Sequence, residues 1–245
     1  MRLTILGMNG PYPAPGGATS GYLLAAGESR IALDMGCGTL SRLTALTPPE
    51  ELTALLLSHW HFDHTTDVLP LIYRLAACAK APLHVYAPVD ETSPVRKIVQ
   101  DCNEMVLHDI APGDAFQVGD AQVTAFAARH PVPAVMYRVS QGGKTFCYTG
   151  DTNTTEALLP FAMGADFLLA DGLFTEAAWR EGPVPAEAKP HLAAHHVAQL
   201  AQDAGVGQFV ITHLNPTVDP QTLLKEARAI RIDAQLAACG NTYEI

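Results

Sequence analysis

The sequence predicts an α/β fold, a four-layer αββα sandwich in which two mixed β-sheets pack face to face with helices outside. Three observations lead to this fold class. Apolar runs of strand length recur along the chain, they fall into two blocks, and segments with helical periodicity follow each block. Because no linker rich in Pro, Gly or Ser divides the chain, we expect one domain over residues 1–245.

Glycine- and proline-rich turns separate the apolar runs and so delimit the strands. The pair Gly142-Gly143 between two runs indicates a hairpin. The earlier strands are expected at Leu3–Leu6, Tyr22–Ala26, Ile31–Asp34, Ala54–Leu57, Leu83–Tyr86, Val106–Ile110, Ala115–Val118, Val123–Ala128, Val135–Val139 and Thr145–Tyr148. Later strands are expected at Phe167–Ala170, Phe209–Thr212 and Ala234–Ala237.

Three segments have the pattern of helices. Asp67 can cap a helix that runs through Ala79, with Pro70 tolerated in its first turn. Leu192–Ala204 places apolar residues on one helical face. Pro220–Ala229 opens with a proline, which is favourable at the first position of a helix.

The composition excludes several classes of protein. Of the 245 residues 48% are hydrophobic and 16% are charged, which is too apolar for a disordered chain. The net charge of −10 argues against a general nucleic-acid binder, because such proteins need a basic face. The five cysteines are scattered without a C-x-x-C spacing, and no stretch has the pattern of a signal peptide or a membrane span. We therefore expect a cytoplasmic protein that makes no membrane contact.

The segment SHWHFDH, residues 58–64, carries the strongest chemical signal, because it follows a buried strand with three imidazoles and one carboxylate. On an extended segment His59, His61 and Asp63 point the same way, and a turn can bring His64 onto a neighbouring metal ion. Imidazole and carboxylate are ligands of zinc and its first-row neighbours. A histidine-rich surface loop is the alternative, but without a metal little would satisfy these groups.

The run H-x-H-x-D-H resembles the signature of the metallo-β-lactamase superfamily. Further landmarks of that family follow in order: His130 in AFAARHP, Asp151 in YTGDT and His213 in FVITHL. Taken singly, each of these could be an ordinary loop or turn residue, and it is the joint pattern that favours ligands. The resemblance extends from Leu3 to His213 and implies the metallo-β-lactamase fold.

The resemblance also implies a centre of two divalent metal ions, expected to be zinc, with manganese or iron as alternatives. One ion would be held by His59, His61 and His130, the other by Asp63, His64 and His213, and Asp151 would bridge the two.

Two branches of the superfamily fit less well. The di-iron oxygen-reducing branch has a Glu where His61 stands in this chain, and the lactam-hydrolysing branch commonly has a Cys where Asp151 stands. Cys147 lies within a predicted strand and is expected to pack in the core.

The C-terminal part resembles the tRNA 3′-processing endonucleases (tRNase Z) and their smaller phosphodiesterase relatives. In those, a His before an alanine-rich helix lies close to the metals, and His191 in PHLAAHHVAQLAQ matches it. Asp171 in LLADGLF matches an acidic partner that is usually Glu. It could orient His191 to protonate the leaving oxygen or to donate to a developing oxyanion. The expected catalytic residues are therefore Asp63, His191 and Asp171, whereas His195 and His196 are expected to be surface histidines.

The long tRNA-binding arm of the tRNA-processing enzymes has no counterpart in this sequence. That arm lies between the motifs that match His130 and Asp151, where this chain has only residues 131–150 with the Gly142-Gly143 hairpin. Together with the negative net charge, its absence predicts a small anionic substrate rather than tRNA.

The predicted reaction is hydrolysis of a small or nucleotide-derived phosphodiester by a metal-bound hydroxide. Two divalent ions outweigh the negative charges of Asp63, Asp151 and a bridging hydroxide, so the centre favours an anion. The same ligands would serve a lactonase or a thioesterase, and a metal-holding binding or sensing module is a third interpretation. Apolar surface on residues 65–79 or 95–105 is a candidate homodimer interface.

Overall fold

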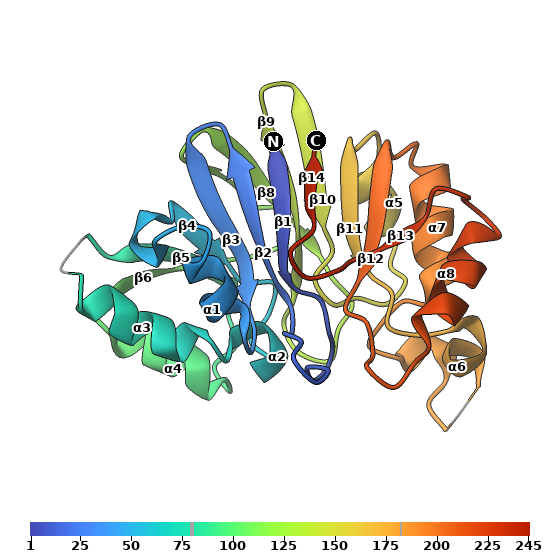
Figure 1. Cartoon of the computed structure of the whole chain (residues 1–245), viewed down its shortest axis with the longest axis horizontal. Helices are drawn as coiled ribbons and strands as arrows, with labels where there is room; N and C mark the ends of the chain where they lie inside the picture. Colours follow the sequence, from blue (N-terminus) through green and yellow to red (C-terminus); the bar gives the residue numbers. More distant parts are fainter. Residues whose placement is uncertain (79–80, 182) are drawn as a thin grey trace.

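Two β-sheets form the centre of the computed structural model, which describes residues 1–78, 81–181 and 183–245 (Figure 1). Within these residues each sheet has seven strands. The first sheet has the order β14 (Thr242–Glu244), β1 (Arg2–Gly7), β2 (Gly21–Ala26), β3 (Ser29–Met35), β4 (Ala54–Leu56), β5 (Leu83–Pro88) and β6 (Met105–Ile110). The second has the order β13 (Gln235–Leu236), β12 (Gln208–Thr212), β11 (Phe167–Asp171), β10 (Lys144–Tyr148), β9 (Val135–Gln141), β8 (Ala121–Ala127) and β7 (Ala115–Val118).

Both sheets are mixed, as predicted. In the first sheet β14, β1, β2 and β3 pair antiparallel, whereas β3 to β6 pair parallel. In the second sheet β7 to β10 pair antiparallel and β10 to β13 pair parallel. The carboxyl ends of parallel strands lie at one edge of their sheet, which is where ligands bind in α/β folds. The seven predicted metal ligands follow strands at this edge.

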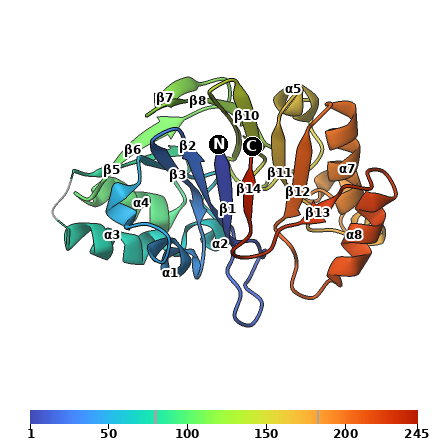
Figure 2. The same ribbon diagram turned by 45° about the horizontal axis from the view of Figure 1, so that its top comes forward.

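Helices cover the outer faces of both sheets (Figures 1 and 2). On the side of the first sheet lie α1 (Thr39–Thr44), α2 (Phe62–Thr65), α3 (Val68–Ala76), α4 (Pro94–Asp101) and the 3₁₀ helix η1 (Pro49–Glu51). On the side of the second lie α5 (Leu158–Ala162), α6 (Glu176–Arg180), α7 (Ala194–Asp203), α8 (Pro220–Arg228) and the 3₁₀ helix η2 (Ala186–Ala188). None of the described helices has the length and apolar character needed to span a bilayer.

Three apolar layers hold the sheets and helices together. Between the sheets, Leu24, Phe146 and Phe167 belong to one buried cluster. Leu71 of α3 is buried against the outer face of the first sheet, and Val197 of α7 against that of the second. Since each sheet buries both of its faces, the predicted four-layer sandwich is confirmed.

The predicted strands are all present, with ends that differ by no more than two residues. The Gly142-Gly143 hairpin joins β9 to β10, and both glycines have positive φ, 59° and 77°. The sequence analysis missed β14 and the helices α1, α2, α4, α5 and α6, because elements this short show little periodicity.

Two helix starts differ from the prediction. Asp67 precedes α3 but makes no capping bond to it; its carboxylate instead accepts a hydrogen bond from the backbone N–H of Leu40 in α1, at 2.9 Å. The predicted helix end at Ala79 lies outside the described residues. Helix α7 begins at Ala194 because the preceding Ala193 has an extended backbone, with φ −92° and ψ 156°.

Candidate metal centre

The structure brings all seven predicted metal ligands together at the carboxyl edges of the two sheets. They are His59, His61, Asp63 and His64 in the segment after β4, His130 after β8, Asp151 after β10 and His213 after β12. Their nitrogen and oxygen atoms form two groups that share Asp151, and within each group the atoms lie within 4.8 Å of one another. This arrangement is suited to holding metal ions.

The first group consists of His59, His61, His130 and Asp151. Nδ1 of His61 lies 3.0 Å from Nε2 of His59 and 3.1 Å from Nε2 of His130. Oδ2 of Asp151 lies 3.7 Å from Nε2 of His59 and 4.0 Å from Nε2 of His130. Three imidazoles and one carboxylate are a donor set typical of zinc sites.

The second group consists of Asp63, His64, His213 and Asp151. Oδ2 of Asp63 lies 3.1 Å from Nε2 of His213 and 3.6 Å from Nε2 of His64. Oδ1 of Asp151 lies 3.2 Å from Nε2 of His64, and its Oδ2 lies 3.4 Å from Nε2 of His213. The carboxylate of Asp151 therefore lies between the two groups.

The extended pattern predicted that Asp63 points the same way as His59 and His61, and this prediction is wrong. The backbone is extended at His61, with φ −62° and ψ 151°, but α2 begins at Phe62. A helical turn abolishes the alternation of side chains, and Asp63 consequently joins His64 in the second group.

Hydrogen bonds determine which nitrogens of the first group carry protons. The Ser58 hydroxyl donates to Asp34 at 2.8 Å, so it accepts from Nδ1 of His59 at 3.0 Å. Nδ1 of His130 lies 3.1 Å from a backbone carbonyl oxygen, which can only accept. When His59 and His130 are neutral, Nε2 of each therefore carries a lone pair that faces Nδ1 of His61. A neutral His61 can donate one proton at most from that nitrogen. A metal cation satisfies these nitrogens better than hydrogen bonds can.

Burial keeps the first group in the protonation state that a metal ion needs. It lowers the pKa of His59 well below its ordinary value, and it lowers the pKa of His61 as well. Burial also brings the pKa of His130 down to about 4. Three neutral imidazoles therefore face one another, as metal coordination requires.

The second group has a deficit of positive charge. Burial raises the pKa of Asp151, but His213 and His64 outweigh this and hold that pKa well below its usual range. Burial lowers the pKa of His64, whereas Asp151 and Asp63 raise it further than burial lowers it. Nε2 of His64 and Oδ1 of Asp151 are buried without a hydrogen-bond partner among the described residues. The residues of both groups therefore fit a pair of divalent ions.

Asp34 is a site residue that the sequence analysis did not identify. Its buried carboxylate accepts hydrogen bonds from Nδ1 of His64 at 2.7 Å, from the backbone N–H of Ser58 at 2.7 Å and from the hydroxyl of Tyr148. Because Nδ1 of His64 donates to Asp34, the neutral His64 ring has its lone pair on Nε2, directed at the second group, which is the form that metal binding needs. The sequence signal that could have identified Asp34 is a carboxylate at the end of the apolar run of residues 31–34.

Two glycines allow the backbone to lie directly against ligands. A Cβ atom at Gly10 would lie 2.0 Å from Nε2 of His213, and one at Gly36 would lie 2.0 Å from the carbonyl oxygen of Asp63. Any side chain at either position would displace a ligand or its backbone.

The predicted pair His191 and Asp171 also meets in the structure. Nδ1 of His191 lies 2.8 Å from Oδ2 of Asp171 and 3.8 Å from Oδ2 of Asp151, and both members of the pair are buried. The imidazole stacks on that of His213, with ring centroids 4.8 Å apart. Burial lowers the pKa of His191, but Asp171 and Asp151 outweigh it and raise the pKa to about 9. The protein's own charges therefore favour a protonated imidazole beside the metal ligands.

Neighbouring polar residues have structural contacts instead. His195 and His196 are half-buried on α7, with their rings tilted by 47° and their centroids 3.9 Å apart, and neither belongs to a ligand group. Lys189 is buried, and its ammonium donates to the carbonyl oxygens of Ala178 and Glu181 at the end of α6. Lys189 thereby holds the backbone two residues before His191 against the end of α6.

Comparison with known proteins identifies relatives along the whole chain. Residues 29–214 match the family model described as the beta-lactamase superfamily domain. The chain is 28% identical to the probable metallo-hydrolase YhfI of Bacillus subtilis (strain 168) over all of both chains. A crystal structure of YhfI superposes with a TM-score of 0.90, covering 100% of this chain and 98% of that one at 27% identity.

Two further relatives carry the name of an RNA-processing enzyme. A Ribonuclease Z of Methanosarcina mazei is 26% identical, with 94% of this chain and 93% of that protein aligned. The short form of human tRNase Z has a TM-score of 0.81 at 20% identity, covering 100% of this chain and 99% of that one, which shows the shared fold.

Replacing Asp34 with Asn is expected to weaken metal binding about 10- to 100-fold, because the amide no longer fixes the tautomer and direction of His64. Metal affinity would be measured by competition with a chromogenic chelator. Asp203→Asn, an exposed change on α7, is the matched control. An Asp34→Asn chain that is folded and binds metal as tightly as the control would contradict this role.

Proposed function

Because the chain belongs to the β-lactamase superfamily as a metallo-hydrolase, we propose that it is a dinuclear phosphodiesterase that acts on a small anionic diester. The observation that carries the proposal is the position of the His191–Asp171 pair. Together with Asp151 and His213 these residues form a third cluster of donor atoms within 4.8 Å of one another. A proton donor at this position suits a reaction in which an ester oxygen leaves.

The proposed metal ligands are those of the two groups. His59, His61 and His130 would hold one divalent ion, Asp63, His64 and His213 the other, and Asp151 would bridge them. Zinc is the proposed ion, and manganese or iron would accept the same donors. Bound ions would supply Lewis acidity, lowering the pKa of a water molecule and neutralising charge on phosphoryl oxygens.

His191 protonates the leaving oxygen in this proposal. Asp171 accepts from its Nδ1, so the proton available for donation is on Nε2, at the far side of the ring. Within the described part of the chain, no hydrogen bond occupies that nitrogen. Asp171 acts through His191 as a positioning residue, because it holds the ring orientation and favours the protonated form.

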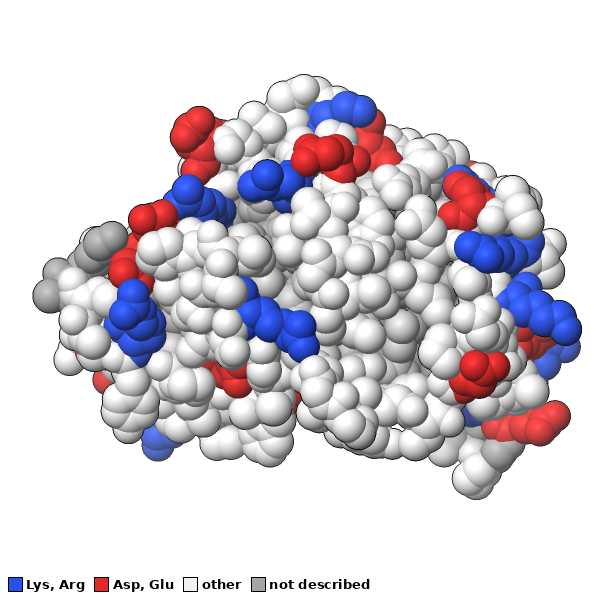
Figure 3. All heavy atoms as spheres, in the orientation of Figure 1, with Lys and Arg blue, Asp and Glu red and all other residues white. Residues whose placement is uncertain are grey.

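A small substrate is favoured over a long nucleic acid. Between β8 and β10 the chain forms one loop and the β9–β10 hairpin, so no extended arm is present in this described region. On the face shown in Figure 3, the described Lys and Arg side chains are scattered among Asp and Glu and form no continuous basic patch. The net charge of −10 supports the same preference.

Lactone or thioester hydrolysis is the second candidate, because metal ligands of this kind also activate carbonyl groups. A metal-holding binding module is the third. The His191–Asp171 pair favours the phosphodiesterase over a binding module, which needs no proton donor, and over a thioesterase, because a thiolate leaves more readily than an alkoxide. A lactone also releases an alkoxide, so the parallel assays below distinguish lactone from diester hydrolysis.

The zinc-loaded chain is expected to hydrolyse bis(p-nitrophenyl) phosphate, with turnover that falls to background in His59→Ala. Release of p-nitrophenolate would be followed by absorbance, with a lactone and a thioester assayed in parallel. Turnover of either acyl substrate with no release from the diester would overturn the phosphodiesterase proposal in favour of the second candidate.

His191→Ala is expected to lower kcat by about 10²- to 10⁴-fold for diesters with poor leaving groups, and by much less for p-nitrophenolate, because a good leaving group needs no protonation. The rates would be compared across diesters of graded leaving-group pKa. His195→Ala, on the same stretch of chain, is the control. An equal loss for every leaving group would show that His191 is not the proton donor.

A further inference from the structure

An apolar cleft opens directly beside the metal ligand His130. Its volume is about 550 Å³, within the range of small-molecule sites. The lining residues are Pro88, Val89, Ile110, Ala111, Pro112, Ala128, His130, Pro131, Val132, Pro133, Ala134 and Val135. Building on the proposed function, we propose that this cleft binds an uncharged aromatic ring, of nucleobase size, on one ester group of the substrate.

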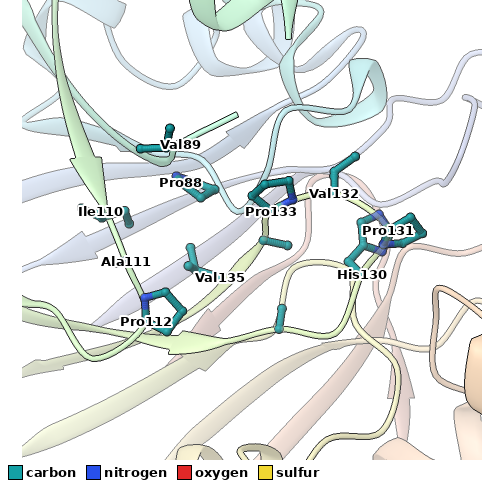
Figure 4. Close-up of a pocket in the computed structure, with 12 residues that line it drawn as sticks. Pro88, Val89, Ile110, Ala111, Pro112, His130, Pro131, Val132, Pro133 and Val135 are labelled. Atoms are coloured by element: carbon teal, nitrogen blue, oxygen red, sulfur yellow. The ribbon is translucent and has the colours of Figure 1, made fainter. Parts of the chain in front are cut away.

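The walls of the cleft come from the same sheet edge as the metal ligands. One wall is formed where the parallel strands β5 and β6 end. The other is formed by the loop between β8 and β9, residues 128–134, which carries His130, and by Val135 at the start of β9 (Figure 4). Strand β4, which precedes the ligand segment, pairs with β5. A diester held by the metal ligands can therefore extend one of its groups into the cleft.

The chemistry of the lining selects an uncharged group. Apart from His130, whose imidazole is buried, the described residues that line the cleft are Pro, Val, Ile and Ala. A phosphate or carboxylate would lose hydration there with no Lys or Arg among the lining residues to compensate, whereas a ring gains from leaving water. Four of the lining residues are prolines, Pro88, Pro112, Pro131 and Pro133, and the CH₂ groups of such rings pack well against an aromatic face.

Hydrogen bonds hold these walls in fixed register with the ligands. The backbone N–H of Val135 donates to the carbonyl oxygen of Ser58 at 2.9 Å, and the indole N–H of Trp60 donates to that of Pro88 at 2.7 Å. Both Ser58 and Trp60 are neighbours of His59 in the chain. Because the prolines also restrict the backbone, the cleft is preformed and little ordering is needed when a ring binds.

The test compares two phosphate monoesters of ribose, one with an adenine base and one with a hydroxyl group in its place. Calorimetry on the zinc-loaded chain would measure the binding of adenosine 5′-monophosphate and of ribose 5-phosphate. The nucleotide is expected to bind about tenfold more tightly or better, because only its base can enter the cleft. Equal affinity for the two compounds would overturn the proposal.

Ala111→Glu tests whether the ring lies in this cleft. Ala111 is exposed and lines the cleft, whereas Ala115 is exposed on β7 and does not, so Ala115→Glu carries the same added charge as a matched control. Ala111→Glu is expected to abolish the preference for the nucleotide over ribose 5-phosphate, and Ala115→Glu to retain it. Val89 is also exposed and lines the cleft. Val89→Glu therefore provides a second variant if Ala111→Glu melts at a lower temperature than the wild-type chain.

The outcomes separate this inference from the proposed function. If both Ala111→Glu and Val89→Glu keep the preference, the ring binds elsewhere and the inference fails. In that case wild-type hydrolysis of bis(p-nitrophenyl) phosphate would still stand. If the zinc-loaded wild-type chain hydrolyses no diester, the proposed function itself is overturned.

Discussion

The site depends on seven imidazole and carboxylate groups that face one another and cannot all be satisfied by hydrogen bonds among themselves. In the first group the hydrogen bonds to His59 and His130 leave lone pairs turned toward His61. In the second, the carboxylates of Asp34, Asp63 and Asp151 surround His64. Such a cluster is unstable on its own, because like groups repel and buried polar atoms lack partners. Bound divalent ions, as proposed, would supply both the positive charge and the missing partners.

The scaffold supplies the rigidity that this cluster requires. Ligands come from strand ends in both sheets, so the apolar layer between the sheets fixes their separation. Within the described residues, Asp34 and His213 are the non-glycine positions with positive φ, 53° and 58°. Each such conformation costs about 1–3 kcal/mol and persists only where surrounding contacts impose it. The hydrogen bonds to Asp34 and the stacking of His191 on His213 are contacts of that kind.

Much of this arrangement could be predicted from the sequence, because strands and strand-end ligands leave a local pattern. Apolar runs with turn residues between them located the strands, and the resemblance to the metallo-β-lactamase superfamily located His130, Asp151 and His213. The helical start at Phe62, which turns Asp63 toward the second group, does not show in a segment of seven residues. Asp34 and the cleft beside His130 were missed for a different reason: their roles arise from contacts between distant segments, such as Tyr148 to Asp34.

The most direct test of the central claim is the metal content of the purified chain, measured by elemental analysis after loading with zinc and removal of free metal. The two ligand groups predict about two ions per chain, since both groups are complete and share Asp151. A chain that retains one ion, or none, would contradict a dinuclear centre.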